Sequence, residues 1–456
     1  MMAIGYTESA IKTPDDPVYR RLLAMRDPRA LEAKVLAAWQ RWGGHVPYRF
    51  RIRILQTHYK PFTRARIVAE ATVEWTAGQF GPSRQLLFLQ TFRSAEKARA
   101  RFAKARRKPL LSCAGPPVFQ LDEWDTVVWA LPNEPKLRTL NVCLDSAVFR
   151  RFLDVQGLGP SESTALEGPR LVRYVPRKRA LFRYQTSSQA GRYMKIYRRG
   201  QDEIAATNLQ AVSAALPAGK GVFRSPSLVT HTPAHRAVVM TELPGQSLTG
   251  QIHKAPASTF TNVGRALAEL HTSWVPTTVS WSPQHELTAL ARAMTDAKRA
   301  LPVLGLEIDD LVDELQRRWL DFRFDEAAPI HGNLFCDQIL VHPDHIGIVD
   351  WDDLCQGDPL YDVGRLIAHI LYLSLQGQVD RGRAVAIVDL LLRGYGQGSQ
   401  RRIPWSRLRL QVVMALLLRA KISALRTLPA GWMADVASAV NEARQILNGR
   451  CCWSTQ

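Results

Sequence analysis

Residues 331–353 read HGNLFCDQILVHPDHIGIVDWDD, and this stretch decides the fold. Two apolar runs, 338–341 and 346–349, predict short strands on either side of a turn. Polar residues in the loop before the first strand can therefore converge on a substrate while the backbone stays paired. Asp350 ends the second strand. A carboxylate in that place is well suited to hold Mg²⁺, which takes oxygen ligands and keeps several waters.

The stretch resembles the active-site loop of the aminoglycoside phosphotransferase and choline kinase family, whose members are relatives of protein kinases. The family pattern H-G-D-x-x-x-x-N, followed by a strand and I-D-[WFL], matches His331, Gly332, Asn333, Gln338 and then 349–351. Four further segments resemble family motifs and occur in the family's order: 193–197, 238–245, 264–271 and 357–364.

The resemblance implies an α+β, protein-kinase-like fold of two lobes. An N-lobe and linker, a small antiparallel sheet plus a helix, are expected over 165–245. A helical C-lobe with the active-site loop is expected over 246–456, with helix breaks at Pro404, Pro429 and the glycine-rich stretch 394–398.

The resemblance also implies ATP as a substrate. Lys195 matches the lysine that grips the α- and β-phosphates, and the expected acidic partner is Glu203, with Asp202 as its rival. The interlobe linker contributes nucleotide-binding residues, which are Thr241, Glu242 and Leu243.

The turn that holds Arg177 and Arg179 lies where the family covers the nucleotide phosphates. It contains no glycine, so it is not a glycine-rich cradle, but its cations are able to neutralise phosphate. The alternative is an exposed basic hairpin.

Two positions in the loop depart from the family pattern. Asp350 matches the metal-binding aspartate, but the metal-binding asparagine is replaced by Gln338, which keeps a carbonyl oxygen for Mg²⁺. The proposed catalytic base is replaced by Asn333, which cannot accept the proton of an attacking hydroxyl. His331 is expected to be structural, and Asp337 is an alternative base that the family pattern does not support.

The substitution at Asn333 leaves two functions open. The first is an ATP-dependent phosphotransferase that acts on a hydroxyl or an amine of a small molecule. A positioned base is typically worth ~10²–10⁴-fold, but phosphoryl transfer passes through a loose transition state that depends less on a base. The second is a catalytically silent pseudokinase that binds nucleotide and acts as a scaffold or regulator.

An internal repeat precedes the family-like region. Residues 59–65 (YKPFTRA) and 174–180 (YVPRKRA) share the pattern Y-x-P-x-x-R-A. In both places the flanking patterns predict three strands and a helix, so residues 1–160 are interpreted as a degenerate copy of the N-lobe. Gln90 in the first copy aligns with Lys195 in the second.

The charge of the chain is uneven. The net charge is +19, and 39 of the 60 Lys and Arg residues but only 18 of the 41 Asp and Glu residues precede position 241. A basic half favours an acidic partner, such as RNA, an anionic membrane or a carrier, although general surface solvation is the alternative. The start of the chain lacks the pattern of an export signal, and no apolar run has the ~20 residues of a membrane span. Together with six cysteines and no C-x-x-C pair, this predicts a cytoplasmic protein without a transmembrane segment.

Overall fold

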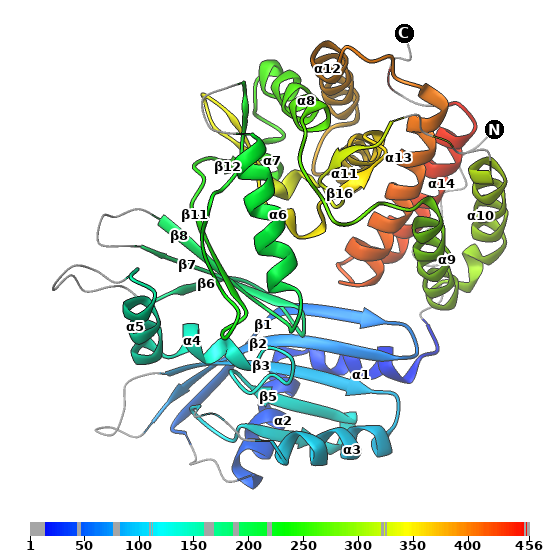
Figure 1. Cartoon of the computed structure of the whole chain (residues 1–456). Helices are drawn as coiled ribbons and strands as arrows, with labels where there is room; N and C mark the ends of the chain where they lie inside the picture. The colour runs from blue at the N-terminus through cyan, green and yellow to red at the C-terminus, as the bar shows by residue number, and fades with distance from the viewer. Residues whose placement is uncertain are drawn as a thin grey trace.

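The computed structural model describes residues 14–42, 47–75, 83–108, 111, 113–158, 168–185, 191–216, 221–320, 323, 326–450 and 453. The first 13 residues, on which the expectation about an export signal depends, lie outside this set. Two five-stranded antiparallel sheets form the N-terminal half, and helices dominate the C-terminal half (Figure 1). The fold is α+β, as the sequence predicts.

The first unit is a sheet of order β1-β2-β3-β5-β4 with helices on both faces. Strand β2 buries alternate residues, among them Ile67 and Val73, against α1 and α2. Asp16 caps α1 and also accepts a hydrogen bond from the Tyr59 hydroxyl at 2.5 Å, so the helix is tied to β1. The elements are α1 (Pro17–Arg26), α2 (Pro28–Arg41), β1 (Arg49–Lys60), β2 (Arg64–Glu74), β3 (Ser83–Phe92), α3 (Ala95–Arg106), β4 (Val118–Leu121) and β5 (Thr126–Ala130).

The second unit is a sheet of order β6-β7-β8-β11-β10, with α6 packed on one face. Its other face shares a hydrophobic core with the first unit, in which Phe182 and Met194 join Phe88 and Trp129. The elements, with two helices that precede the sheet, are α4 (Asn141–Leu144), α5 (Ser146–Val155), β6 (Arg170–Val175), β7 (Arg179–Gln185), β8 (Gly191–Tyr197), α6 (Asp202–Ala215), β10 (Leu228–Thr232) and β11 (Ala237–Thr241).

The two units have the same topology. In each, the fifth strand inserts between the third and the fourth, and a helix joins the third strand to the fourth. The repeated motif has the same register, because Tyr59 pairs with Ala65 as Tyr174 pairs with Ala180. The residue after the motif proline has a positive φ in both turns, 52° and 66°. We retain the duplication as a proposal, which this shared topology supports.

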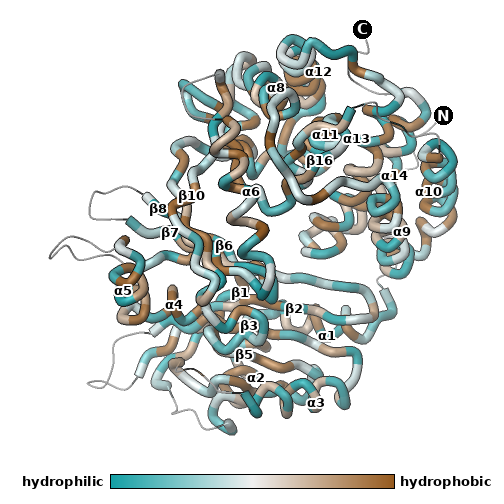
Figure 2. Tube along the Cα trace, viewed as in Figure 1, coloured by the Kyte–Doolittle hydropathy of each residue, from teal (hydrophilic) through white to brown (hydrophobic). Residues whose placement is uncertain are grey.

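The C-terminal half consists of helices around the strand–loop–strand of residues 331–353. Strands β14 and β15 pair antiparallel, with Ile339 opposite Ile348. Hydrophobic residues gather where sheets and helices meet, and no helix of the described ranges is long and apolar enough to cross a membrane (Figure 2). The elements are β9 (Phe223–Arg224), β12 (Gln246–Ser247), α7 (Leu248–Gln251), α8 (Ala257–Thr272), α9 (Pro283–Ala300), α10 (Gly305–Leu320), β13 (Ala328–Ile330), β14 (Ile339–Val341), β15 (Ile346–Ile348), β16 (Cys355–Gly357), α11 (Leu360–Leu375), α12 (Arg381–Ser399), α13 (Trp405–Ala420) and α14 (Trp432–Leu447).

The prediction of a helix break at 394–398 is wrong, because these residues form the last turns of α12. Gly394 and Gly398 serve helix packing instead. A Cβ atom on Gly394 would lie 2.0 Å from the Thr261 carbonyl oxygen, and one on Gly264 would lie 2.1 Å from the Leu391 carbonyl oxygen. Helices α8 and α12 therefore approach each other too closely for any side chain at these two positions.

The first unit is docked on the C-terminal helices. Arg26 donates to the Leu428 carbonyl at 2.7 Å, and the Tyr59 amide donates to the Arg426 carbonyl at 2.7 Å. The rings of Tyr19 and Trp432 are 6.2 Å apart, in an edge-on contact. The first unit thus contacts the helical half directly, in addition to the second sheet.

Candidate functional site

Buried hydrogen bonds hold the loop that precedes β14. Asp362, in the first turn of α11, accepts from the amides of His331 and Gly332 at 2.6 and 3.0 Å. The His331 ring is buried, and its Nε2 lies 3.0 Å from the Val349 carbonyl oxygen. A Cβ atom on Gly332 would lie 2.1 Å from the Asp353 carbonyl oxygen. His331 therefore positions the backbone of the loop and does not reach into a cavity.

A cluster of two cations and two carboxylates lies where β15 ends. Lys195 Nζ contacts Asp350 and Asp352 at 2.5 and 2.7 Å. Arg179 contacts the same two carboxylates at 2.8 and 2.7 Å, and the Tyr197 hydroxyl donates to Asp352 at 2.7 Å. Burial alone would raise the pKa of Asp350, but Lys195 and Arg179 outweigh burial and hold that pKa well below its usual range.

The acidic partner of Lys195 is not Glu203, so that prediction is wrong. Glu203 is exposed on the outer side of α6, and its rival Asp202 pairs with His231 at 3.0 Å. The inner face of α6 instead carries Asn208, which donates to the Trp351 carbonyl at 3.0 Å. The helix therefore presents an amide towards the cluster, and the carboxylates come from the loop after β15.

A cleft of about 410 Å³ opens on one side of the cluster. Its walls come from the second sheet, from the segment after β11 and from the loop around β14. The Thr241 hydroxyl accepts a hydrogen bond from the Ser227 amide, and Glu242 forms a two-point contact with Arg183 at 2.8 Å. The cleft brings together most of the nucleotide-binding residues that the sequence predicts: Arg179, Lys195, Thr241, Glu242 and Leu243.

Arg177 does not line this cleft, which contradicts the prediction for it. Its side chain turns towards the first unit, where Nη1 donates to Gln90 Oε1 at 3.3 Å. Arg66 Nε donates to the same oxygen at 3.3 Å. Because φ at Arg177 is +66°, the turn directs this side chain away from Arg179. Of the two arginines in the turn, only Arg179 reaches the cluster.

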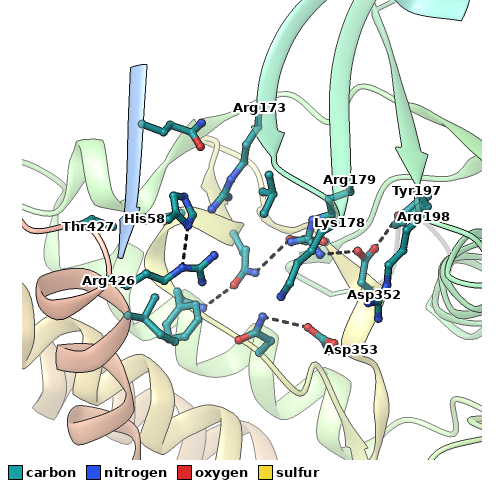
Figure 3. A pocket seen from close by; sticks show the side chains of 18 of the residues that line it. His58, Arg173, Lys178, Arg179, Tyr197, Arg198, Asp352, Asp353, Arg426 and Thr427 are labelled. Carbon is teal, nitrogen blue, oxygen red and sulfur yellow. Dashed lines mark hydrogen bonds and ion pairs between the residues drawn. The ribbon is translucent and has the colours of Figure 1, made fainter. Parts of the chain in front are cut away.

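A second cavity, of about 680 Å³, opens on the other side of the cluster (Figure 3). Asn333 lies in its wall and donates from Nδ2 to Asp353 Oδ2 at 3.0 Å. Asp337 is also in the wall and accepts from the Thr249 hydroxyl at 2.7 Å. The two cavities meet at the cluster and share eight lining residues: Arg173, Val175, Arg179, Tyr197, Asp337, Gln338, Asp350 and Asp352.

Gln338 is oriented against the predicted metal contact. Its carbonyl oxygen accepts the Phe335 amide at 2.8 Å, so its NH₂ group faces Asp350 Oδ2 at 3.5 Å. The extra methylene relative to asparagine lets the side chain fold back onto its own loop. In this arrangement Gln338 offers a donor to Asp350, and its oxygen is already in use.

Asp350 and Asp352 are the residues that fit Mg²⁺. All four of their oxygens accept from Lys195 or Arg179, which shows that the cluster already balances these two negative charges. Mg²⁺ is commonly held by one or two carboxylates together with phosphate oxygens. No cluster of three or more His, Cys, Asp or Glu side chains suited to a metal occurs in the described ranges.

A comparison with models of known protein families gives a match that includes this site. The model of the phosphotransferase enzyme family (APH) matches residues 178–405, which is half of the chain. The chain belongs to this family. This match confirms the family resemblance that was inferred from the loop. The matched residues include the cluster at which the two cavities meet. No curated protein matches the chain significantly.

Solved structures similar to this family member include three kinases. A choline/ethanolamine kinase family protein from Mesorhizobium loti is 18% identical, with 63% of this chain and 89% of that chain covered and a TM-score of 0.46. A macrolide 2'-phosphotransferase from Brachybacterium faecium is 19% identical, with coverage of 65% and 98% and a TM-score of 0.44. A choline kinase from Cryptosporidium parvum is 11% identical, with coverage of 67% and 96% and a TM-score of 0.49.

Sequence reasoning missed three contributors to the site. Asp352 and Asp353 stand in the DWDD segment, but their roles depend on which way each carboxylate points after the turn at Asp350. The third contributor is the wall that β1 of the first unit adds to the larger cavity, at residues 54–58. No local pattern in the sequence indicates that these distant residues face the loop.

Proposed function

We propose that this member of the phosphotransferase family transfers the γ-phosphoryl group of ATP to a hydroxyl, or an amine, of a small molecule. The observation that carries the proposal is the meeting of two cavities at the cluster of Lys195, Arg179, Asp350 and Asp352. A nucleotide in the smaller cleft would place its phosphates at the cluster, and an acceptor in the larger cavity would reach the same point from the opposite side. A cytoplasmic location belongs to the proposal and agrees with four unpaired cysteines among the described residues.

The cluster is arranged to exchange partners when ATP binds. Lys195 and Arg179 would turn from the carboxylates to phosphate oxygens, which frees Asp350 and Asp352. These carboxylates would then hold Mg²⁺, which neutralises phosphate charge when bound. Such electrostatic stabilisation supplies most of the catalysis in phosphoryl transfer.

Asp353 is the residue we propose as the proton acceptor. The acceptor oxygen forms a bond to the γ-phosphorus while the bond from that phosphorus to the β,γ-bridging oxygen breaks. ADP leaves, and the hydroxyl proton passes to the Asp353 carboxylate. Asn333 donates to this carboxylate and so positions it at the edge of the larger cavity. The pair would replace the single aspartate that the family pattern has at position 333.

Two observations favour a second candidate, a silent member that binds nucleotide and acts as a scaffold or regulator. Asn333 itself cannot take up a proton, and the Gln338 oxygen is held by the Phe335 amide. This candidate keeps the nucleotide cleft but has no turnover.

The test is turnover of radiolabelled ATP with Mg²⁺ and a panel of small hydroxyl and amine compounds. We expect measurable transfer by the wild type. Lys195→Met should lower kcat/KM by at least ~100-fold, because the phosphates lose their buried cation. Asp353→Asn should lower kcat by ~10–100-fold, which is below the usual range for a base because the transition state is loose.

Glu203→Gln is the matched control, since Glu203 is exposed on α6, and its activity should equal that of the wild type. Nucleotide binding by all variants is measured separately by calorimetry with ATP and Mg²⁺. ATP binding without transfer in the wild type, and transfer only after Asn333→Asp, would establish the silent candidate. Absence of ATP binding would rule out both candidates.

A further inference from the structure

We propose that the acceptor of this phosphotransferase carries an anionic group, a phosphate monoester or a carboxylate, and that Arg173, Lys178 and Arg426 bind it in the larger cavity. That the bound molecule is the acceptor rests on the proposed function. That it is anionic rests on the side chains that line the larger cavity.

Two separate parts of the chain bring the three cations into this cavity. Arg173 and Lys178 come from the hairpin of β6 and β7, and Arg426 follows the π-helical segment Lys421–Leu425 that extends α13. Figure 3 shows these three side chains directed towards the same space between β1 and the active-site loop. Arg173 and Lys178 are exposed and Arg426 is half-buried, so the arrangement is an open, concave basic surface.

No ion pair of Arg173, Lys178 or Arg426 occurs among the described residues, although most other clustered charges of the site are paired. Asp350 and Asp352 are paired with Lys195 and Arg179, whereas Asp353 and Asp337 accept hydrogen bonds from the neutral side chains of Asn333 and Thr249. The charges of Asp353 and Asp337 act on Lys178 and Arg173 and so offset part of the positive charge. Because Arg198 and Arg419 line the same wall as the three cations, positive charge remains in excess over these two carboxylates.

The unpaired cations also repel one another. Burial lowers the pKa of Lys178, and the charge of Arg426 lowers it further. Burial likewise lowers the pKa of Arg426, with added repulsion from Arg173 and Arg64. Like charges held close together in a partly desolvated cavity are unfavourable until an anion binds between them.

The first unit holds Arg426 in place without adding charge. Arg426 Nε donates to His58 Nδ1 at 2.9 Å, while the Arg426 carbonyl accepts the Tyr59 amide. Burial and the nearby Arg426 lower the pKa of His58 to about 3, so its ring is neutral at physiological pH. Because Nδ1 accepts a hydrogen bond, Nε2 bears the hydrogen and is a further donor for an anion. This gives the additional N-terminal unit a role in acceptor recognition.

The size and position of the cavity suit a small bifunctional molecule. About 680 Å³ lies within the usual range of small-molecule sites, ~300–1,000 Å³. Asn333 and Asp353 line the same cavity as the three cations. A hydroxyl can therefore sit beside Asp353 while an anionic group on the same molecule contacts Arg173, Lys178 and Arg426.

The test begins with inorganic phosphate as the probe, at constant ionic strength, with binding measured by calorimetry on the full chain. We expect phosphate to bind the wild type and to bind at least ~10-fold more weakly to Arg173→Gln and to Lys178→Gln. Arg170→Gln is the matched control, because Arg170 is exposed on the same strand as Arg173 and lies outside the cavity. The titration is repeated with saturating ADP and Mg²⁺, which occupy the nucleotide cleft, and phosphate should still bind and still depend on Arg173 and Lys178. Both test variants remove exposed side chains from strand or turn positions, so folding should be kept, as thermal unfolding can verify.

The acceptor class is then tested with ATP, Mg²⁺ and four hexose derivatives that differ in charge: glucose, glucosamine, gluconate and glucose 6-phosphate. We expect transfer to the anionic pair to exceed transfer to the neutral and cationic pair, and to fall ~10-fold or more in Arg173→Gln. Equal phosphate binding by the wild type, Arg173→Gln and Lys178→Gln would overturn the proposal, as would preferred transfer to glucosamine. Phosphate binding that depends on Arg173 but comes with no transfer would keep the anion site and instead refute the proposed phosphotransferase activity.

Discussion

The same sheet position has different uses in the two units. Gln90 and Lys195 both lie in the third strand, opposite Arg66 and Leu181 of the second strand. Lys195 contacts the carboxylates of Asp350 and Asp352, whereas Gln90 accepts hydrogen bonds from Arg66 and Arg177 and so joins the two units. The different residue at this one sheet position therefore places Lys195 in the candidate site and Gln90 at the interface between the two units.

A buried carboxylate near this junction makes stability depend on pH. Glu134 is fully buried, and burial raises its pKa to about 7 despite the nearby Lys136 and Leu137 amides, Arg177 and Arg66. Its ordinary value in an unfolded chain is 4.5. Between these two values the folded state keeps a proton that the unfolded state has lost, so stability falls as pH rises.

Glu134→Gln should remove this dependence, since the amide is neutral at every pH. The wild type should lose about 2–3 kcal/mol of unfolding free energy between pH 5 and pH 8 through this residue, and the variant should not. Urea unfolding at the two pH values measures the difference. Glu203→Gln, at an exposed site, is the control. An unchanged pH dependence in Glu134→Gln would show that Glu134 is ionised in the folded protein at pH 5.

At the level of helices and strands, the contact between α8 and α12 helps to support the loop that precedes β14. Gly264, Gly394 and Gly398 lie in this contact and leave no space for side chains. Helix α8 also carries His271, whose Nε2 lies 3.3 Å from Asp362, the residue that holds the amides of His331 and Gly332. The crossing of the two helices therefore helps to set the position of the loop that precedes β14.

Gly394→Ala should destabilise the protein by ~1–3 kcal/mol, because the new methyl group collides with the Thr261 carbonyl. Gly396→Ala, two residues along the same helix, adds a methyl group in open space and should stabilise by up to ~1 kcal/mol through helix propensity. Thermal unfolding of both variants is the measurement. Similar shifts in Tm for the two would mean that the helices separate at little cost.

At the scale of the whole molecule, the three predicted domains remain a proposal, at 1–160, 165–245 and 246–456. They do not have separate cores. The first and second units share one hydrophobic cluster, and α1 and α2 belong to the cluster of the C-terminal helices. The acidic partner that the basic N-terminal half favours also stays a prediction.

A fragment of residues 165–456 should therefore fail to fold as a soluble monomer. It would expose Phe182, Met194 and Ile196, which are each 0% exposed in the whole chain. Exposed apolar surface of this kind promotes association. Size-exclusion chromatography and binding of a hydrophobic dye compare the fragment with the full chain. A monomeric fragment that unfolds cooperatively with a Tm near that of the full chain would show that the kinase-like part is independent.

The sequence by itself determined the family, the two short strands around the turn, the repeated hairpin and the places of Lys195 and Asp350. These features depend on local periodicity and on motif order, which are readable along the chain. The resemblance led to Glu203, because it implies that the partner of the lysine is an acid on the following helix. In the structure Lys195 instead contacts Asp350 and Asp352, which lie 155 and 157 residues away.

Only the tertiary structure decided the composition of the larger cavity. His58, Arg173 and Arg426 come from three regions of the chain, and the docking of the first unit on the C-terminal helices brings them together. Packing between distant elements sets such contacts, and it leaves no periodic signal in any one segment. For this reason the sequence of residues 331–353 was enough to identify the family, whereas the proposed charge of the acceptor depends on contacts that exist only in the folded chain.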